Sequence, residues 1–397
     1  MKIAIIREEK NPPDSRVPLA PFQVESLISK GYKIQVQRSS NRCFKDEEYE
    51  ALAIPMIDEI TDQDFLLGVK EVPVDNIKYD KTYFMFSHTI KEQPYNAKLI
   101  QKIISQKSSL IDYEVLVDDD ENRVIAFGKF AGMVGAHNAL YTYGVQTKLF
   151  SLPRMNELDD YNAAKDLYSK INLPNTKIVL TGTGRVSNGA ALVLEDMGIK
   201  KVSPLSFVSE AFDFPVYTQL SSFYYAKRKD GKPFEDIQDF YDNPSKYESD
   251  FHHYINQADI FINGIYWHPE APAFFTSEQM KNNFAIKVIA DITCDIAPEA
   301  SVPSTLRPST IADPVYGYDV QSKQEITPYS GGIDIMAIDN LPNELPKDAS
   351  IAFGEMFIKN VLTPLENGDD SIIKRGTIVD KGNLTQRFNY LKNYAGQ

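Results

Sequence analysis

The sequence predicts an α/β protein with mostly parallel sheets. Short apolar runs of strand length alternate with stretches of helical spacing through the first 116 residues, which is typical of strand–helix–strand units. A strand, a glycine-rich turn and a helix then follow one another between residues 177 and 198. A length of 397 residues with 43% apolar side chains indicates two or three domains with packed cores.

The beginning of the chain supplies the clearest strands and helices. The helices are expected over Pro21–Lys30, which is followed by Gly31, and over Tyr95–Ser105. The strands are apolar runs bounded by polar turns: Lys2–Ile6, Tyr32–Val36, Phe65–Val69, Tyr83–Phe86 and Leu110–Leu116. Because strands and helices alternate, these strands are expected to lie parallel in one sheet.

A long helix is expected to leave this first domain. The segment Phe130–Leu149 is rich in glycine, alanine and apolar residues and lacks proline, so it is predicted as one connecting helix. A second unit then opens with the strand Lys177–Thr181 and runs to about Pro314. Later elements are an apolar strand within 330–340, a helix over 348–365 and helical composition over 383–394.

The last part of the chain is expected to fold back on the first domain. The predicted division is therefore one domain from residues 1–130 together with about 318–397, and a second domain from residues 131–317. The second domain then forms an insertion between the two parts of the first.

The charge and the composition exclude several classes of function. The 55 acidic and 42 basic side chains give a net charge of -13, which repels nucleic-acid phosphates and anionic membranes. The chain has no apolar run long enough to span a membrane and no signal-peptide core at its N-terminus. Cys43 and Cys294 are expected as free, mostly buried thiols. A cytoplasmic protein that binds neither nucleic acid nor membrane is predicted.

No metal site is predicted. The five histidines and two cysteines do not fall into a zinc-binding spacing, and the adjacent pair His252–His253 lacks a matching acidic partner motif.

The glycine-rich turn of Lys177–Gly198 has the context of a dinucleotide-binding site. Gly182 permits a tight turn, and Gly184 lets the backbone approach a pyrophosphate. The helix that begins near Val186 points its free N–H groups at that anion. We expect cofactor contacts from Gly182, Gly184, Arg185 and Val186; a purely structural strand–helix turn is the alternative.

The third glycine of the usual pattern is displaced. It would fall at Ser187, so Gly189 and Ala190 are expected to allow close packing of the helix on the strand.

The sequence favours NADP over NAD as the nicotinamide cofactor. The next expected strand, Lys201–Leu205, includes Ser203 and lacks the acidic residue that usually binds a ribose 2′-hydroxyl. Ser206, Ser209 and the basic run Lys227–Lys229 tolerate a 2′-phosphate. A solvated basic loop is an equally good interpretation. Ser203 is a candidate cofactor contact.

Ionisable residues follow several of the expected strands, where ligands gather in open parallel sheets. Lys70 and Glu71 follow one strand and His88 another, so the lysine and the histidine can form an acid/base pair. Glu114 follows a third strand. The competing interpretations are a solvated lysine and a satisfied core histidine.

Arginines and one aspartate complete the candidates. Arg16 and Arg123 lie in short turns, and arginine is the natural bidentate ligand of a carboxylate. Asp295 lies beyond the apolar run 288–292. Each of these residues can also be a surface charge or a turn residue.

Together these segments resemble the lysine-2-oxoglutarate reductase and lysine-forming saccharopine dehydrogenase family, which belongs with alanine dehydrogenase and the transhydrogenases. The resemblance extends in order over most of the chain: Leu67–Ile77, Phe86–Lys91, Leu110–Glu114, Arg123–Gly132, Thr181–Gly189, Phe261–Trp267, Ala290–Asp295 and Ile338–Pro346. It implies two Rossmann-like domains with parallel sheets and an active site in the cleft between them.

The resemblance also implies a reaction and roles for the candidate residues. The family joins lysine to 2-oxoglutarate, reduces the imine with a nicotinamide hydride and forms saccharopine, or runs the reverse. By resemblance, Lys70 and His88 are the acid/base residues, and Asp295 lies beside the reacting carbon. Arg16 and Arg123 are then expected to bind the substrate carboxylates. Glu71 and Glu114 are expected to lie near the amines of the lysine substrate.

Two other functions stay open at this point. Alanine dehydrogenase shares the lysine, the histidine and the aspartate, but its substrate has no second ammonium for Glu71 and Glu114. A nucleotide-binding regulator without turnover is the alternative from another class, and the intact Lys70 and His88 argue against it.

Overall fold

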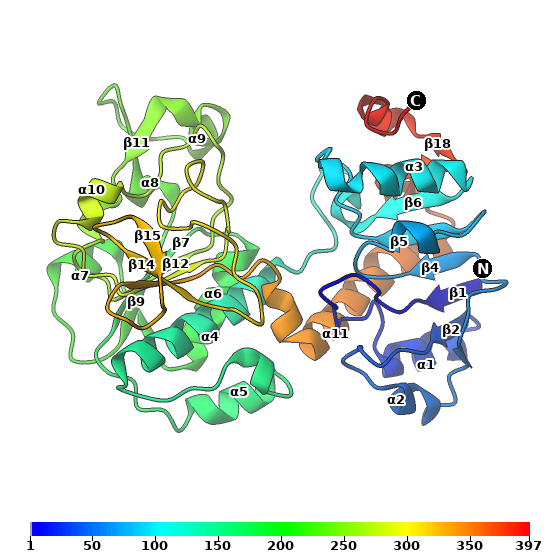
Figure 1. Ribbon diagram of the computed structural model, residues 1–397, viewed down its shortest axis with the longest axis horizontal. Coiled ribbons are helices and arrows are strands. Elements are labelled where there is room, and N and C mark those ends of the chain that lie inside the picture. Colours follow the sequence, from blue (N-terminus) through cyan, green and yellow to red (C-terminus); the bar gives the residue numbers. More distant parts are fainter. Residues whose placement is uncertain (1) are drawn as a thin grey trace. The chain divides into compact units, whose positions relative to one another are not determined.

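The computed structural model describes residues 2–397, and the chain divides into two compact units. The first unit comprises Met1–Phe127 and Pro346–Gln397, and the second comprises Gly128–Leu345. Each unit is built on one eight-stranded, mostly parallel sheet with helices (Figure 1). This confirms the predicted α/β class with two Rossmann-like domains.

The sheet of the first unit contains all the strands expected from the early part of the chain. Its order is β18-β17-β6-β5-β4-β1-β2-β3. The parallel strands are β1 (Lys2–Ile5), β2 (Lys33–Gln37), β3 (Met56–Ile57), β4 (Phe65–Leu67), β5 (Thr82–Met85) and β6 (Ser109–Asp112). The carboxyl ends of β1, β4, β5 and β6 therefore lie at one edge of the sheet.

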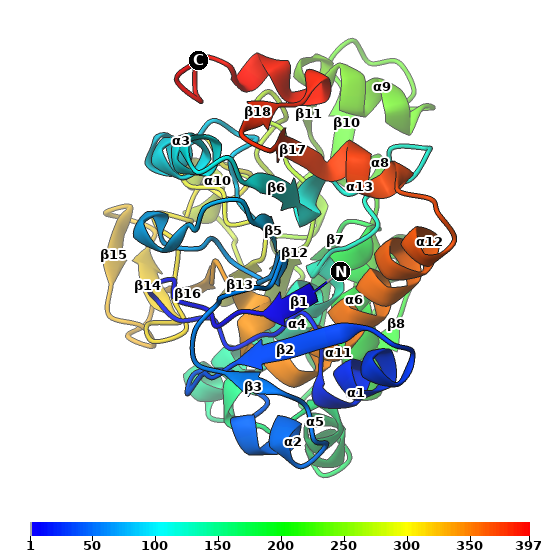
Figure 2. The same cartoon turned by 90° about the vertical axis from the view of Figure 1, so that its right-hand side faces the viewer.

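The C-terminal segment completes this first unit, as expected. β17 (Thr377–Asp380) pairs antiparallel with β6, and β18 (Asn383–Leu384) extends the edge. The helices of the unit are α1 (Pro21–Ser29), α2 (Asp46–Glu50), α3 (Ala97–Ser105), α11 (Pro346–Phe357), α12 (Thr363–Glu366) and α13 (Ser371–Gly376). Figure 2 shows the orange helices α11 and α12 beside the blue helix α1. The expected helix over 383–394 is wrong, because β18 and a short 3-10 turn, Gln386–Leu391, occupy it.

Both faces of the first sheet are covered by apolar side chains. Ile3 and Ile5 on one face of β1 belong to a buried cluster with Phe353 and Phe357 of α11. Ala4, on the other face, belongs to a second cluster with residues of α3. The alternation of side chains along the strand thus requires the returning C-terminal helix, because the first face would otherwise be exposed.

The sheet of the second unit has the order β15-β14-β16-β13-β12-β7-β9-β8. Its strands are β7 (Lys177–Thr181), β8 (Lys200–Lys201), β9 (Val216–Leu220), β12 (Ile260–Asn263), β13 (Val288–Asp291), β14 (Tyr316–Asp319), β15 (Gln324–Ile326) and β16 (Ile333–Met336). The predicted boundary at 317/318 is wrong for a physical reason: β14, β15 and β16 complete this sheet, so residues 318–345 belong to the second unit.

The connecting helix is found at α4 (Gly128–Thr147) and packs closely on α6 (Arg185–Asp196). A Cβ on Gly189 would collide with the Lys129 carbonyl, and one on Gly132 would collide with the Val186 carbonyl. Gly189 therefore serves helix–helix packing, and the expected packing of Gly189 on the strand is wrong.

The remaining elements of the second unit lie around this sheet. They are α5 (Tyr161–Tyr168), α7 (Pro204–Ser209), α8 (Ser222–Tyr225), α9 (Ile237–Asp242), α10 (Ser277–Met280) and the hairpin of β10 (Ala226–Arg228) with β11 (Tyr247–Ser249). Cys43 and Cys294 are free thiols, as expected, and both are partly rather than fully buried.

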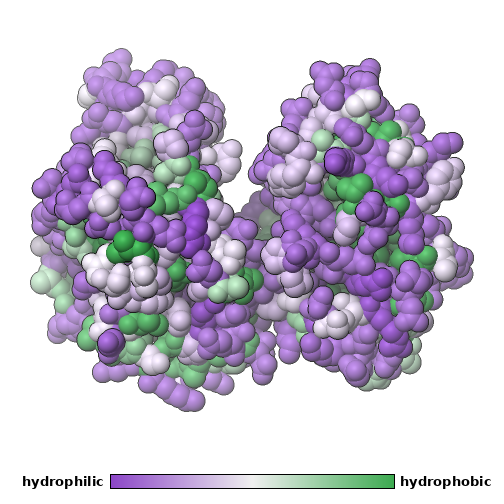
Figure 3. Space-filling view, viewed as in Figure 1, coloured by the Kyte–Doolittle hydropathy of each residue, from purple (hydrophilic) through white to green (hydrophobic). Residues whose placement is uncertain are grey.

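Surface character agrees with the charge of the chain. On the face drawn in Figure 3, apolar residues form small separate groups within a mostly hydrophilic surface. None of the helices within residues 2–397 is both long enough and apolar enough to cross a membrane.

Candidate active site

Charged residues of the first unit gather where parallel strands end. Lys70 and Glu71 follow β4, His88 follows its neighbour β5, and Glu114 follows β6, the next strand of the sheet. The strand-end argument therefore placed these side chains at one edge of the sheet.

Glu71 lies at the centre of a hydrogen-bonded group. Its Oε1 accepts from His88 Nδ1 at 2.7 Å, and its Oε2 accepts from Lys10 Nζ at 2.8 Å. Asn96 Nδ2 donates to the Ser87 carbonyl at 3.0 Å and reaches Glu71 Oε1 at 3.4 Å. Burial raises the pKa of Glu71, but the hydrogen bond and charge of His88 and the hydrogen bond from Lys10 outweigh it, giving a value of about 2. Glu71 is therefore an ionised acceptor for the histidine.

Lys70 lies in an environment that favours its neutral form. Burial and, next, the positive charge of Arg16 lower the pKa of the Lys70 ammonium below its ordinary value. The backbone around it is fixed by Glu8, whose carboxylate accepts the N–H groups of Val69 at 2.6 Å and Lys70 at 2.9 Å. A lysine with a lowered pKa loses its proton more readily than a solvated lysine, which suits it to proton transfer.

Asp112 holds two of the strand-end loops together. Its Oδ2 accepts the Ser87 N–H at 2.9 Å and the Ser87 hydroxyl, and its Oδ1 accepts the Glu114 N–H at 2.7 Å. Asp112 is fully buried, which raises its pKa. His88, next to Ser87, has a φ of +52°, a strained conformation of the kind that concentrates at functional sites.

Arg16 is placed deep in the first unit. It is 2% exposed and binds Asp14 through both Nε, at 2.9 Å, and Nη2, at 2.6 Å. Its guanidinium also lies 4.2 Å from the ring centre of Phe127. The structure thus brings Arg16 near Lys70 and gives it a carboxylate partner within the chain.

Glu114 and Arg123 lie close together, although the sequence analysis assigned Arg123 to a substrate carboxylate and Glu114 to an amine of lysine. Arg123 Nη1 is 3.9 Å from Glu114 Oε1, and Lys91 Nζ is 3.8 Å from the same oxygen. The second oxygen of Glu114 is buried without a hydrogen-bond partner among residues 2–397. An unpaired buried carboxylate oxygen is costly, so it is a natural place for a donor from a ligand.

Sequence reasoning missed five residues of this site. They share no motif, and the contacts of three of them, Glu8, Lys10 and Asp112, join segments far apart in sequence; the full set is Glu8, Lys10, Asp14, Asn96 and Asp112. The one available signal was position, since Glu8 and Lys10 follow β1 and Asp112 ends β6 in the same way that Lys70 follows β4.

The glycine turn of the second unit fits a dinucleotide. Gly182 has a φ of +97°, which only glycine adopts freely, and no atom lies within 4 Å of a Cβ built on Gly184. Gly184 is the N-cap of α6, and since glycine has no side chain, no side-chain oxygen caps this helix. The open space at Gly184, at the N-terminus of α6, suits a phosphate group, because the positive end of the helix dipole lies there.

Ser187 takes the position of the missing third glycine. Its hydroxyl donates to the carbonyls of Thr181 at 2.8 Å and Gly264 at 3.0 Å. This buried serine joins α6 to the ends of β7 and β12 by hydrogen bonds. The helix therefore approaches the strands closely here without the third glycine.

The strand expected to carry the ribose contact is misplaced. Residues 201–205 were expected as the next strand along the chain, but β8 covers only Lys200–Lys201, and α7 begins at Pro204. In the sheet, β9 lies between β7 and β8. Ser203 is the N-cap of α7 and accepts the Ser206 N–H at 3.0 Å. β9 lies beside β7 in the sheet, and Ser221 and Ser222 follow its last residue, Leu220. The end of β9 therefore also lacks an acidic residue that could bind a ribose 2′-hydroxyl.

The basic run Lys227–Lys229 no longer supports NADP. Lys227 pairs with Asp250 at 3.2 Å, and Arg228 pairs with Asp239 at 2.6 Å. Lys229 donates to the Ser245 carbonyl at 2.8 Å. These residues bind within the chain, so the choice between NAD and NADP stays open.

Asp295 follows a buried polar network at the ends of three strands. Asn263 of β12 receives a hydrogen bond from Thr181 of β7 at 2.9 Å and donates to Asp291 of β13 at 2.9 Å. Thr305 donates to the other oxygen of Asp291 at 2.6 Å. The network fixes the loop that carries Asp295 relative to the glycine turn.

Comparison with known proteins assigns part of the chain to a family. Residues 5–134 match the family described as "Alanine dehydrogenase/PNT, N-terminal domain". This segment belongs to that family. Over most of its length the chain is also similar to alpha-aminoadipic semialdehyde synthases and lysine-forming saccharopine dehydrogenases, which confirms the resemblance seen in the sequence. Alpha-aminoadipic semialdehyde synthase, mitochondrial, of Mus musculus is 31% identical over 98% of this chain and 47% of the relative.

A fungal relative is matched over most of its own length. Saccharopine dehydrogenase [NAD(+), L-lysine-forming] of Schizosaccharomyces pombe is 28% identical over 90% of this chain and 91% of the relative. The mammalian relative is longer, so the chain spans about half of its length.

Two solved structures share the fold. An L-alanine dehydrogenase matches with a TM-score of 0.69 and 16% identity, and both chains are fully covered. A transhydrogenase from Sinorhizobium meliloti matches with a TM-score of 0.61 and 14% identity, covering 97% of this chain and 100% of the other.

Proposed function

We propose that the protein is a nicotinamide-dependent oxidoreductase that interconverts saccharopine with L-lysine and 2-oxoglutarate. The observation that carries the proposal is the arrangement of Lys70 with the hydrogen-bonded pair His88–Glu71 at the ends of adjacent strands. The names of the relatives over most of the chain support it. The wider class, an amino-acid dehydrogenase, follows from the same relatives.

The proton transfers of this reaction fall to Lys70 and His88. Condensation of an amine with a ketone requires a proton to leave nitrogen and a water molecule to leave carbon, so a base and an acid are both needed. Lys70, with its lowered pKa, exchanges a proton with the substrate nitrogen. His88 donates Nδ1–H to Glu71, which orients the ring, and a proton on Nε2 passes to the hydroxyl of the addition product, which leaves as water.

The substrates of this reaction carry several charges that match the first unit. Saccharopine has three carboxylates, which call for cations such as Arg123, Arg16 and Lys10. Arg16 already binds Asp14, so it holds a carboxylate either directly or through that pair. The free oxygen of Glu114 suits the α-ammonium group of lysine. The sequence assigned the same role to Glu71, whose oxygens bind His88 and Lys10, so Glu114 is the better candidate.

The second unit holds the cofactor in this proposal. When bound, the nicotinamide supplies or accepts the hydride. Gly184 and the first turn of α6 bind the pyrophosphate, and Asp295 lies on the loop that the Asp291 network positions. The fungal relative is named for NAD(+), and the sequence favoured NADP, so both forms belong in the test.

An absorbance assay tests the function. Purified protein with lysine and 2-oxoglutarate should oxidise NADH or NADPH, and saccharopine with the oxidised cofactor should run the reverse. Faster turnover of pyruvate with ammonium would establish an alanine dehydrogenase instead. Nucleotide binding without turnover of either pair would establish the regulatory alternative.

A further inference from the structure

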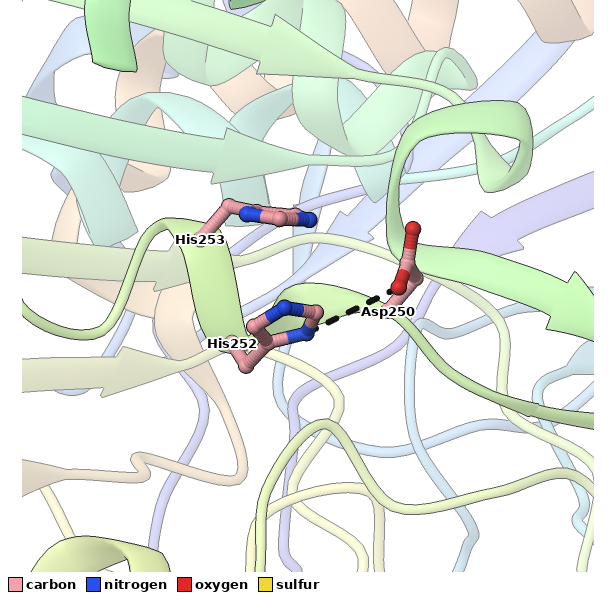
Figure 4. A group of neighbouring side chains, drawn as sticks. All are labelled: Asp250, His252 and His253. Carbon is pink, nitrogen blue, oxygen red and sulfur yellow. Dashed lines mark ion pairs between the residues drawn. The ribbon is translucent and has the colours of Figure 1, made fainter.

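Three metal-ligating side chains of the second unit converge just after β11. Asp250, His252 and His253 each offer one ligand atom, and these three atoms lie within 4.8 Å of one another. Asp250 Oδ1 is 3.6 Å from His252 Nδ1, and the two imidazole rings have centres 3.8 Å apart. Figure 4 shows both rings and the carboxylate turned toward one another. The acidic partner that the sequence analysis did not find is therefore Asp250.

The backbone that carries this cluster is firmly anchored. Asp250 N–H donates to the Tyr225 carbonyl at 2.8 Å, and Phe251 N–H donates to the Ser249 hydroxyl at 3.2 Å. Phe251 is fully buried, and its ring lies 4.9 Å from that of Phe261. Because the core holds residue 251, the neighbouring side chains are presented at the surface with little freedom left in the backbone.

We propose that Asp250, His252 and His253 bind one divalent transition-metal ion, with Zn²⁺ as the preferred ion. Carboxylate and imidazole are its usual ligands, and bonds of about 2.0 to 2.1 Å in a tetrahedral site place neighbouring ligand atoms roughly 3.3 Å apart. The Asp250–His252 distance is close to this value, and side-chain rotation closes the rest. Three protein ligands leave the fourth position to water.

Lys227 shows that this position already attracts a cation. Its Nζ lies 3.2 Å from Asp250 Oδ1 and 3.6 Å from Glu248 Oε1. The metal must displace this ammonium, and the lysine, which is 48% exposed, can stay with Glu248 at the surface. The competition weakens metal binding, so removal of Lys227 is expected to strengthen it.

The cluster lies away from the proposed cofactor site. Residues 254–259 lead from His253 into the amino end of β12, whereas Gly182 follows the carboxyl end of the parallel strand β7. The metal therefore takes no part in hydride transfer. It links the end of the β10–β11 hairpin to the turn before β12, so its effect should appear in stability and not in nucleotide affinity.

Calorimetric titration of tag-free, chelator-treated full-length protein with ZnCl₂ and CoCl₂ tests the proposal. One equivalent of each metal should bind, and His252→Ala, His253→Ala and Asp250→Asn should each weaken binding roughly tenfold or more. Lys227→Gln should tighten it. His268→Ala is the matched control, because His268 is also exposed and lies outside the cluster.

The outcomes separate clearly. Loss of binding in the three ligand variants, with unchanged melting temperatures of their metal-free forms, supports the site. Binding by the double variant His252→Ala/His253→Ala that equals wild type overturns it, as does the absence of any saturable binding in wild type. A metal that raises the melting temperature of wild type but not of the double variant supports the proposed structural role.

Discussion

Single acidic side chains determine how the candidate catalytic residues of the first unit are held. Glu71 fixes His88, and Asp112 fixes the backbone of Ser87 and Glu114. Glu8 does the same for the backbone of Lys70. Each accepts at least two hydrogen bonds, which is the support that a buried polar group requires.

Lys70→Met should abolish turnover and leave nucleotide binding almost unchanged. Methionine keeps the apolar bulk of the partly buried side chain but cannot exchange a proton with the substrate nitrogen. Stopped-flow turnover and nucleotide titration measure the two effects separately. Lys98→Met, an exposed change on α3, is the control and should behave as wild type. Wild-type turnover in Lys70→Met would remove Lys70 from the mechanism.

Glu114→Gln should raise the Michaelis constant for lysine more than that for 2-oxoglutarate. The free carboxylate oxygen is assigned to the lysine ammonium, and the loss of one charge-assisted hydrogen bond costs roughly 1.5 to 3 kcal/mol, or about 10- to 150-fold in affinity. Steady-state kinetics with each substrate varied measures this. A change in the 2-oxoglutarate constant alone would invert the assignment, in agreement with the nearby Arg123.

Asp334→Asn should stabilise the protein at neutral pH. Asp334 is 1% exposed, its Oδ2 lacks a hydrogen-bond partner among residues 2–397, and burial raises its pKa to about 6. A raised carboxyl pKa favours the protonated folded form, so the wild type loses stability as pH rises from about 4 to about 6. The loss is about 3 kcal/mol at neutral pH.

Chemical denaturation at several pH values measures this difference. The gain in stability from Asp334→Asn should be largest above pH 6, where the carboxyl group of Asp334 is ionised in the wild type. It should disappear in acid, where that group is protonated. Asp291→Asn is the matched comparison, because burial also raises the pKa of Asp291 to about 6. Asp291 accepts from Asn263 and Thr305, so an amide there faces a donor and should destabilise. An Asp334→Asn variant that is less stable at pH 8 would contradict the argument.

At the scale of elements, two glycines of one turn–helix unit have different tasks. Gly184 borders open space, and Gly189 touches the backbone of α4. The first leaves space beside the turn and the second allows two helices to pack, although the sequence pattern presents both as small residues of the same motif.

Gly184→Val should weaken binding of the dinucleotide without loss of stability. Its φ of -85° suits valine, and the new side chain meets no atom of the chain, so only a bound phosphate is displaced. We expect a loss of about tenfold or more in calorimetric titration, the equivalent of one charged hydrogen bond. Gly189→Ala should instead lower the melting temperature, because its Cβ collides with the Lys129 carbonyl. Unchanged affinity in Gly184→Val would make the loop a structural turn.

At the scale of the whole molecule, the two units differ in how the chain builds them. The second unit is one continuous segment, Gly128–Leu345. The first needs both ends of the chain, because α11 covers one face of its sheet and β17 pairs with β6.

A protein limited to residues 128–345 should fold and bind the dinucleotide. A protein limited to residues 1–345 should keep a folded second unit but lose the cooperative unfolding of the first, since Phe353 and Phe357 leave the apolar cluster. Calorimetric unfolding and nucleotide titration of both proteins check this. A single unaltered transition in the shorter chain 1–345 would show that the first unit does not need its C-terminal part.

The sequence by itself determined the fold class, the strands β1, β2, β4, β5 and β6 of the first sheet, the connecting helix and the glycine turn, and it predicted that Lys70 and His88 follow strands. These features rest on local signals, namely apolar runs, glycine at a turn and charged residues directly after a strand. Residue 182 needs glycine because its φ is positive, and that requirement is visible in the sequence as a motif.

Only the tertiary structure decided the pairing of distant residues. Lys10 binds Glu71 across 61 positions of the chain, β9 enters the sheet between β7 and β8, and residues 318–345 join the second sheet. No local pattern specifies such pairings, because they depend on which apolar faces and which buried polar groups find partners once the whole chain is packed. The roles of Glu71, Arg16 and Glu114 depend on those partners.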